Sequence, residues 1–129
     1  MKTLVLSNGA LEEKDITNEL ETLQEIVGGY IEIPSVSEVF NDNVIDMIIN
    51  EEGKLIEGFK PEIAIADKER GNILDVIYGN CIFASHDDEG ETISLNDEQI
   101  KIIEEELYTI VELTDRNTKE KFEVRVLFI

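Results

Sequence analysis

The sequence predicts an α+β fold with a mostly antiparallel sheet and two principal helices, in a single domain spanning residues 1–129. Three observations support this prediction. Short runs of β-branched and aromatic residues are separated by turn signals, two segments carry apolar residues at helical spacing, and 129 residues are enough for one hydrophobic core. No internal repeat, low-complexity tract or linker divides the chain.

The amino-terminal part predicts a strand followed by a helix. The strand covers residues 3–6 and ends at residues 7–9, Ser-Asn-Gly, which tolerate turn geometry. The helix begins after Thr17 or Asn18, because either side chain can accept a hydrogen bond from the free amides of the first turn. Its apolar face comprises Leu20, Leu23, Ile26 and Val27.

The helix stops at a glycine pair and leads directly into a second strand. Gly28 can adopt the left-handed conformation that closes a helix, and Gly29 adds a second permissive joint. Ile31 and Ile33 then alternate with polar neighbours, as in a half-buried strand, until Pro34 ends the ladder. A phosphate-binding loop is not indicated, because such loops lead from a strand into a helix.

The next segment predicts a loop and a hairpin. Residues 35–43 form the loop, with a short helical turn around residues 37–40. The apolar run at residues 44–49 is a strand covered on both faces, and the turn signal at residues 50–53 allows residues 54–56 to return as its partner.

Residues 61–67 fit two structures. Pro61 suits the first position of a helix, whereas the alternating isoleucines suit a strand, and a short helix is the preferred interpretation. Residues 73–78 and residues 81–84 are predicted strands, and the Gly-Asn pair between them is a tight turn or a bulge.

The clearest local signal is a capped helix after the acidic turn at residues 87–91. Asn96 can cap this helix, Gln99 can complete a capping box, and Leu95 can pack on Ile100. The buried face of the helix comprises Ile100, Ile103 and Leu107.

The end of the chain predicts a hairpin. Residues 108–113 and residues 122–128 are rich in β-forming residues, and the polar connector at residues 114–119 joins them. Alternation along both runs places the polar side chains on the outer face.

The charge balance is the most unusual bulk property of the chain. Its 30 acidic and 11 basic side chains give a formal net charge of −19 at pH 7. Such a charge repels phosphate backbones and anionic lipids, so neither nucleic acid nor a membrane is expected as a direct ligand. A partner protein with a basic face is favoured, because complementary potentials speed encounter. Solubility alone is the competing explanation.

Cys81 and His86 are the only residues of their kind. A single cysteine excludes an internal disulfide, and a zinc site requires more sulfur or imidazole ligands than these two. A catalytic pair would have to be in contact, which their separation along a strand and its exit does not favour. The acidic turn lacks the alternating spacing of a calcium-binding loop. We therefore expect a protein that is not an enzyme and that needs no metal or other cofactor.

Three segments occur in a distinctive order: Val-Gly-Gly-Tyr-Ile-Glu at 27–32, Asn-Glu-Glu-Gly-Lys-Leu at 50–55 and Asp-Val-Ile-Tyr-Gly-Asn at 75–80. With the acidic turn and capped helix that follow, this order resembles an uncharacterised domain-of-unknown-function family of small phage and mobile-element proteins, over roughly residues 20–105. In that family a proline, an asparagine and an alanine usually follow the second segment, whereas here Pro61 precedes Glu62. The resemblance implies a phage or plasmid setting and no established activity.

The leading functional hypothesis is a non-enzymatic counter-defence inhibitor in the cytosol of the host cell. Small acidic proteins from the implied setting are often counter-defence factors. An acidic strip could occupy the basic groove of a nucleic-acid-binding host protein by mimicking phosphates; an ordinary solvated helix face is the simpler explanation. The residues of this acidic strip are Asp87, Asp88, Glu89, Asp97, Glu98, Glu104, Glu105 and Glu106.

The alternative hypothesis is a sponge that captures a nucleotide-like signalling molecule without hydrolysing it. Arg70 offers bidentate phosphate geometry, and Tyr30 or Tyr78 could stack on a base. A third hypothesis is that the protein is a structural or assembly partner of another protein. The sequence leaves the oligomeric state open, a homo-oligomer included. The amino terminus has only a short apolar run, so neither a signal peptide nor a membrane span is expected.

Overall fold

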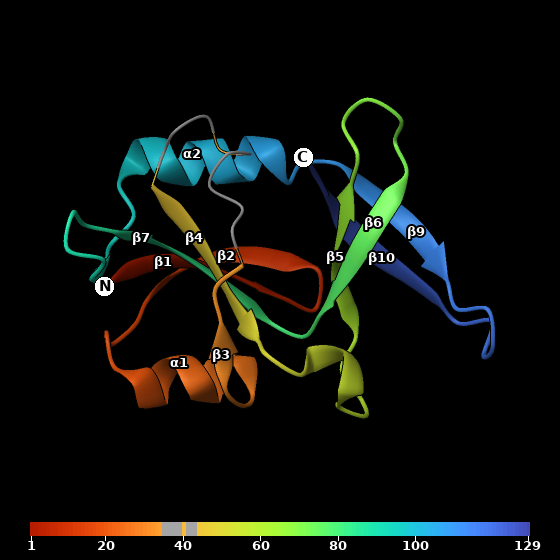
Figure 1. Cartoon of the computed structure of the whole chain (residues 1–129), viewed down its shortest axis with the longest axis horizontal. Coiled ribbons are helices and arrows are strands. Elements are labelled where there is room, and N and C mark those ends of the chain that lie inside the picture. The colour runs from red at the N-terminus through yellow and green to blue at the C-terminus, as the bar shows by residue number, and fades with distance from the viewer. Residues whose placement is uncertain (35–39, 41–43) are drawn as a thin grey trace.

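The computed structural model describes residues 1–34, 40 and 44–129, and in this part of the chain the strands form two sheets (Figure 1). The first sheet comprises, in spatial order, β2 (Ala10–Asp15), β1 (Lys2–Ser7), β7 (Cys81–His86), β4 (Ile45–Asn50) and β3 (Ile31–Glu32), with β8 (Thr92–Ile93) paired to β7. The second comprises β6 (Ile73–Tyr78), β5 (Pro61–Ala66), β10 (Lys121–Phe128) and β9 (Ile110–Thr114). The helices are α1 (Leu20–Val27), α2 (Asp97–Glu106) and the short 3-10 helix η2 (Gly53–Leu55).

These elements confirm the two principal helices and the predominance of antiparallel strands, but the single predicted sheet is two sheets in the structure. The pairing of β10 with β5 is parallel, and the other described strand pairs are antiparallel. The second sheet is therefore mixed.

The two α-helices cover opposite faces of the first sheet, above and below it in Figure 1. Side chains alternate between the faces of a strand. Met47 and Phe83 accordingly join the core cluster that contains α2, whereas Ile48 and Ile82 join the cluster that contains Leu23 of α1. The central strands β1, β7 and β4 are thus buried on both sides.

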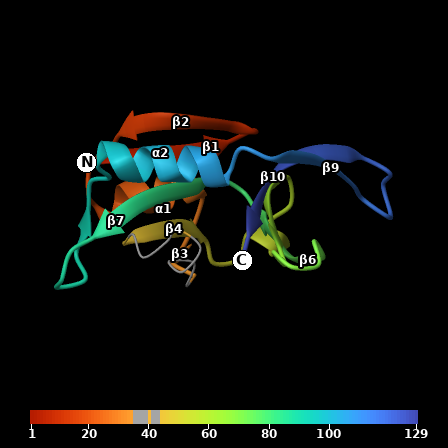
Figure 2. The same ribbon diagram turned by 90° about the horizontal axis from the view of Figure 1, so that it is seen from above.

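The larger core cluster also holds the two sheets together. Ile63, Ile77 and Leu127 of the second sheet belong to the same cluster as Ile103 of α2. Figure 2 shows the first sheet under α2 and the second sheet beside it, with the β9–β10 hairpin extending away from the first sheet. Burial of this shared cluster stabilises the arrangement of the two sheets.

Several local predictions are confirmed. Gly28 closes α1 with a φ of 82°, in the left-handed region. At α2, the Asn96 side chain accepts a hydrogen bond of 2.8 Å from the Gln99 amide, and the Gln99 side chain accepts one of 2.9 Å from the Asn96 amide. Leu95 and Ile100 are buried in one cluster, as the predicted staple requires.

The predicted helix at residues 61–67 is wrong. This segment is the strand β5, in which all six residues are buried. It pairs with β6 on one edge and with β10 on the other. Pairing on both edges determines its conformation, and the first-turn preference of Pro61 for a helix is overridden.

The predicted hairpin after β4 is also wrong. Residues 53–55 form η2, and β4 pairs with β7 and β3, so neither of its edges is free for a returning strand. The strand β2 was not predicted, because its Leu-Glu-Glu-Lys-Asp sequence is charged. It is an exposed edge strand, where charged side chains are common.

The amino terminus of α1 differs from the prediction. Glu19 occupies the N-cap position without a side-chain hydrogen bond, while the Asn18 side chain donates one of 2.8 Å to the Thr92 carbonyl. Leu20 is 57% exposed and does not belong to the buried face. The helical turn predicted around residues 37–40 falls on residues of which the structure describes only Phe40. No helix in the described residues is long and apolar enough to span a bilayer.

Candidate functional site

Two asparagine side chains cap the carboxyl end of α1. Asn50 Nδ2 donates a hydrogen bond of 3.1 Å to the Val27 carbonyl, and Asn80 Nδ2 donates one of 3.0 Å to the Ile26 carbonyl. Carbonyls in the last turn of a helix have no partner within the helix. The end of β4 and the connection from β6 to β7 are therefore both fixed to this helix terminus.

Glycines allow these segments to approach each other closely. A Cβ atom on Gly28 would lie 2.9 Å from Phe59, and one on Gly79 would lie 2.7 Å from the same ring. A Cβ atom on Gly53 would lie 2.4 Å from the carbonyl oxygen of Tyr78. The three sequence segments at 27–32, 50–55 and 75–80 thus meet in space.

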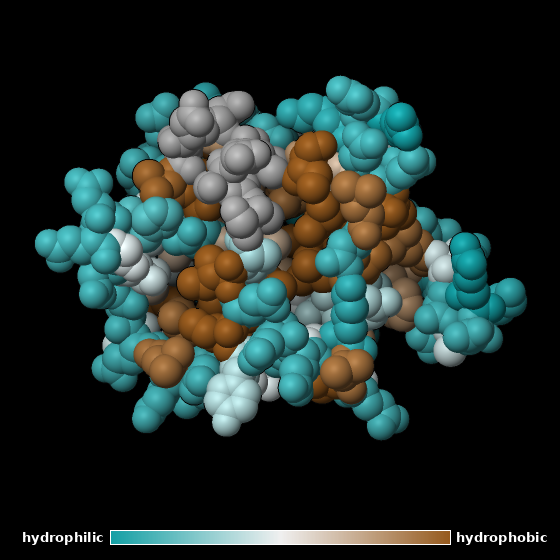
Figure 3. Space-filling view, viewed as in Figure 1, coloured by the Kyte–Doolittle hydropathy of each residue, from teal (hydrophilic) through white to brown (hydrophobic). Residues whose placement is uncertain are grey.

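A pocket of about 380 Å³ opens where the ends of β4 and β6 approach each other. Figure 3 shows apolar side chains reaching the surface in the middle of this face, with polar side chains around them. The residues lining the pocket are Glu32, Pro34, Ile49, Asn50, Glu51, Glu52, Gly53, Lys54, Leu55, Ile65, Asp75, Val76, Ile77 and Tyr78.

The charged side chains of the pocket are unbalanced. Glu32, Glu51, Glu52 and Asp75 are acidic, whereas Lys54, which pairs with Asp75, is the single basic residue among the described lining residues. Partial burial acts to raise the pKa of Asp75, but hydrogen bonds from Lys54 and from the Val76 amide lower it below its ordinary value. Asp75 is therefore ionised at neutral pH, and the pocket is apolar within and acidic at its rim.

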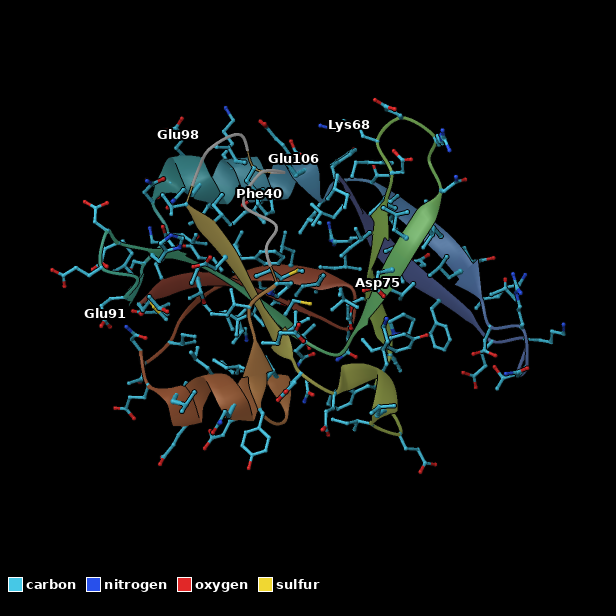
Figure 4. The ribbon with its side chains drawn as sticks, viewed as in Figure 1. Phe40, Lys68, Asp75, Glu91, Glu98 and Glu106 are labelled. Atoms are coloured by element: carbon cyan, nitrogen blue, oxygen red, sulfur yellow. The ribbon has the colours of Figure 1, made fainter. Side chains whose placement is uncertain are left out.

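The residues of the acidic strip lie in two places. Asp87, Asp88 and Glu89 form the turn between β7 and β8, whereas the other five belong to α2. Figure 4 shows Glu98 and Glu106 near the two ends of α2, with Glu91 in the β7–β8 turn. Asp87 accepts hydrogen bonds of 2.9 Å from the amides of Glu89 and Glu91, and therefore stabilises its own turn.

The acids of α2 differ in their relation to the helix dipole. Asp97 and Glu98 lie in the first turn, where negative charge is favourable, and Asp97 also pairs with Lys2 at 3.2 Å. Glu104, Glu105 and Glu106 end the helix, where negative charge is unfavourable, and no basic residue lies in that turn. Asp97 and Glu98 therefore stabilise the helix that carries them, whereas Glu104, Glu105 and Glu106 destabilise it.

The chain matches the model of one uncharacterised protein family. Residues 1–108 match the model of DUF3846, a domain of unknown function. The chain belongs to the DUF3846 family. The match confirms the predicted relationship to an uncharacterised domain family, and it extends beyond the segments that suggested it. No curated protein and no solved structure matches the chain.

The DUF3846 match contains the pocket, α2 and the whole acidic strip. The β9–β10 hairpin follows the matched residues and pairs with β5 through β10. Residues 109–129 carry four acidic and four basic side chains, so the formal charge of −19 resides entirely on residues 1–108.

The three residues of the nucleotide hypothesis are not gathered around the pocket. Tyr78 lines it, whereas Tyr30 and Arg70 do not. Tyr30 is 74% exposed just after α1, and Arg70 is exposed in the turn between β5 and β6. In this DUF3846 protein the acidic rim is also opposite in sign to what a phosphate requires.

Cys81 and His86 do not form a pair. Cys81 belongs to the core cluster on the α2 side of β7, and His86, five residues on, lies on the other face of the strand. His86 Nδ1 lies 2.8 Å from Asp46 Oδ2 on the neighbouring strand. Burial, together with the charge of Glu62, raises the pKa of the Cys81 thiol. Among the described residues, no group of three or more His, Cys, Asp or Glu is placed to hold a metal ion.

Sequence reasoning did not anticipate the pocket or the two helix-capping asparagines. The segments that form them were recognised only as turns and strand ends. Asn50 is 4% exposed. A polar residue at the end of a predicted buried strand was the available signal, because a buried amide needs hydrogen-bond partners.

Proposed function

We propose that this DUF3846 protein is a non-enzymatic binding protein of phage or mobile-element origin. It acts in the host cytosol as a counter-defence inhibitor, and it uses the acidic carboxyl end of α2 to bind a basic, nucleic-acid-binding host protein. Both the charge of residues 1–108 and its distribution support the proposal. The decisive observation is the run of Glu104, Glu105 and Glu106 in the last turn of α2.

This run opposes the stability of the helix that carries it. Each acid at a helix carboxyl terminus costs roughly 0.3–1 kcal/mol, because the aligned peptide dipoles place partial negative charge there. Glu104 and Glu105 are exposed, and Glu106 is half-buried. A cationic partner at this position would relieve the repulsion among the glutamates and interact favourably with the helix terminus at once.

The rest of the molecular surface favours the same class of partner. A formal charge of −19 attracts basic proteins over distances limited by the Debye length, about 8 Å at physiological salt. Encounter with such a partner is accelerated, and encounter with nucleic acid is suppressed.

The test is affinity capture from host lysate with wild type and two triple variants of equal charge. In the test variant, Glu104, Glu105 and Glu106 become Gln. In the control, Glu19, Glu21 and Glu25 become Gln; these residues lie in or next to α1, on the opposite face of the first sheet. We expect the test variant to lose the captured protein, and the control to retain it.

The test variant is expected to be more stable than wild type, which separates a loss of binding from a loss of folding. Removing three unfavourable charges should raise the melting temperature of the test variant, so lost binding could not be attributed to unfolding. Capture that survives both the test variant and high salt would contradict the proposal.

Capture of a nucleotide-like molecule has weaker support. Tyr78 in the pocket wall is the observation that favours it, because an aromatic ring can stack on a base. A thermal-shift screen with cyclic nucleotides tests this alternative, since a ligand that binds only the folded state raises the melting temperature. No shift at millimolar nucleotide would count against it.

A further inference from the structure

We propose that the pocket between the ends of β4 and β6 receives an arginine side chain of the basic partner. This inference rests on the proposed function and adds a site and a chemistry to it. The pocket is separate from the glutamates at the end of α2, none of which is among its lining residues.

The walls of the pocket suit a side chain that is apolar along its length. Six lining residues are apolar and come from β4, β5, β6 and the segments beside them. They are Pro34, Ile49, Leu55, Ile65, Val76 and Ile77. The aliphatic part of an arginine can lie along such a surface while its charged end stays near water. A volume of about 380 Å³ also leaves space for an apolar neighbour of the arginine.

The rim of the pocket suits a planar cation. Glu32, Glu51 and Glu52 are exposed residues that line the pocket. Lys54, the only cation among the described lining residues, is already paired with Asp75. Guanidinium groups bind carboxylates through two parallel hydrogen bonds and stack on aromatic rings. Tyr78 is the aromatic residue among the described lining residues, and aromatic rings attract cations. A phosphate-bearing ligand would meet repulsion at the same rim.

The rim is held in place before any ligand arrives. Asn50 is anchored to the end of α1, and its Oδ1 accepts a hydrogen bond of 2.7 Å from the Glu52 amide. Gly53 packs against the Tyr78 carbonyl so closely that a Cβ atom would lie 2.4 Å from it. The turn bearing Glu51 and Glu52 is therefore fixed against β6, and little conformational entropy is lost when a ligand binds.

The probe is a blocked tripeptide with arginine between two leucines, titrated into the isotope-labelled full chain and followed by amide NMR. Its matched control replaces arginine with citrulline, which has nearly the same shape and no charge. We expect the arginine peptide to shift the amide signals of Gly53, Asp75 and Tyr78, and the citrulline peptide to bind on the order of tenfold more weakly.

Two variants of equal charge separate the pocket from the general acidity of the protein. Glu51→Gln with Glu52→Gln should weaken binding of the arginine peptide by on the order of tenfold, whereas Glu104→Gln with Glu105→Gln should change it by less than about twofold. All four side chains are exposed, and amide spectra of the free variants verify the fold. Equal weakening by both variants, equal binding of the two peptides, or signal changes confined to α2 would overturn the inference.

This experiment is independent of the proposed function, because it requires no host protein. If capture of the host protein depends on Glu104, Glu105 and Glu106 while the peptide does not bind the pocket, only the pocket inference is wrong. If the peptide binds the pocket but no basic host protein is captured, the proposed function is wrong, and the pocket is a cation site without the inferred partner.

Discussion

The buried carboxylate of Glu62 on β5 accepts a hydrogen bond of 2.9 Å from the backbone amide of Asn8. Its second oxygen accepts one of 2.8 Å from the amide of Gly9. Glu62 is 4% exposed, and the turn it holds joins β1 to β2 in the other sheet. A charged residue of the second sheet therefore fixes a turn of the first, and Arg125 of β10 adds a hydrogen bond of 3.2 Å to the Gly9 carbonyl.

Replacing Glu62 with Gln should lower the free energy of unfolding by about 1–3 kcal/mol, because one of the two amides would then face an amide donor in a buried position. Chemical denaturation followed by circular dichroism measures the change. Glu57→Gln is the matched control on an exposed residue, and we expect it to stay within about 0.5 kcal/mol of wild type. If the two variants are equally stable, Glu62 does not join the sheets.

Gly28 should tolerate alanine less well than Gly58. Both glycines have positive φ, 82° and 91°, so alanine strains the backbone at each by roughly 1–2 kcal/mol. At Gly28 the new Cβ would also lie 2.9 Å from the Phe59 ring, whereas at Gly58 it would meet no atom of the described residues within 4 Å. Denaturation should therefore show a larger loss of stability for Gly28→Ala.

The contact with Phe59 can be isolated with a double-mutant cycle. Phe59→Leu replaces the ring that the new methyl group would meet with a smaller aliphatic side chain. Gly28→Ala should therefore cost less in the Phe59→Leu background than in wild type. Additive effects would show that backbone strain alone explains the sensitivity of Gly28.

The β9–β10 hairpin should be essential to the stability of the part that matches DUF3846. Leu127 of β10 is fully buried in the larger core cluster, whereas Ile129 is 49% exposed. Leu127→Ala should cost about 2–5 kcal/mol by leaving a cavity, and Ile129→Ala should cost less than about 0.5 kcal/mol. Denaturation midpoints compare the two variants. A small effect at Leu127 would mean that the hairpin is an independent addition to the fold.

Local signals predicted the parts of this fold that local chemistry determines. The capping box of α2 is complete within four residues, from Asn96 to Gln99, and it forms as predicted. Gly28 likewise closes α1 through its own backbone conformation. Where the partner is distant in sequence, the same reasoning was wrong. Residues 61–66 form a strand because β10, about 60 residues later, pairs with them.

In the candidate site, too, local features could be predicted and contacts between distant segments could not. Its acidic residues are visible in the sequence, but the distinction between Glu98 and Glu104 depends on which helix end each occupies. The pocket could not be predicted, because it forms where β4 and β6 of two different sheets approach each other. Nor does the sequence show that Asp75 pairs with Lys54, 21 residues away, since that contact requires η2 to pack against β6.

Cys81 should react slowly with alkylating reagents in the folded protein. Burial, and secondarily the charge of Glu62, raise the pKa of its thiol, and the thiolate is the reactive form. Iodoacetamide labelling at pH 8, followed by mass spectrometry, should therefore proceed only as fast as the protein unfolds, and should accelerate through the urea transition. Rapid labelling without urea would contradict the burial of Cys81.

The stability contributed by Asp75 should disappear in acid. Its pKa is lower in the folded protein than its ordinary value of 3.8, so the folded state favours the ionised carboxylate. Linkage then requires that this contribution be fully present above the unfolded pKa and be lost as the pH falls through the folded pKa. Urea midpoints of wild type and Asp75→Asn should differ modestly at pH 6, as expected for a partly exposed ion pair. They should converge as the pH falls from 3.8 through the folded pKa of Asp75.

Lys54→Met tests whether the stability contributed by Asp75 depends on its ion pair with Lys54. It removes the hydrogen bond that Lys54 donates to Asp75, so Asp75→Asn should cost less stability at pH 6 in the Lys54→Met background than in wild type. The same urea midpoints measure this coupling. A cost of Asp75→Asn that persists unchanged in acid would show that Asp75 stabilises the fold through packing and not through its charge.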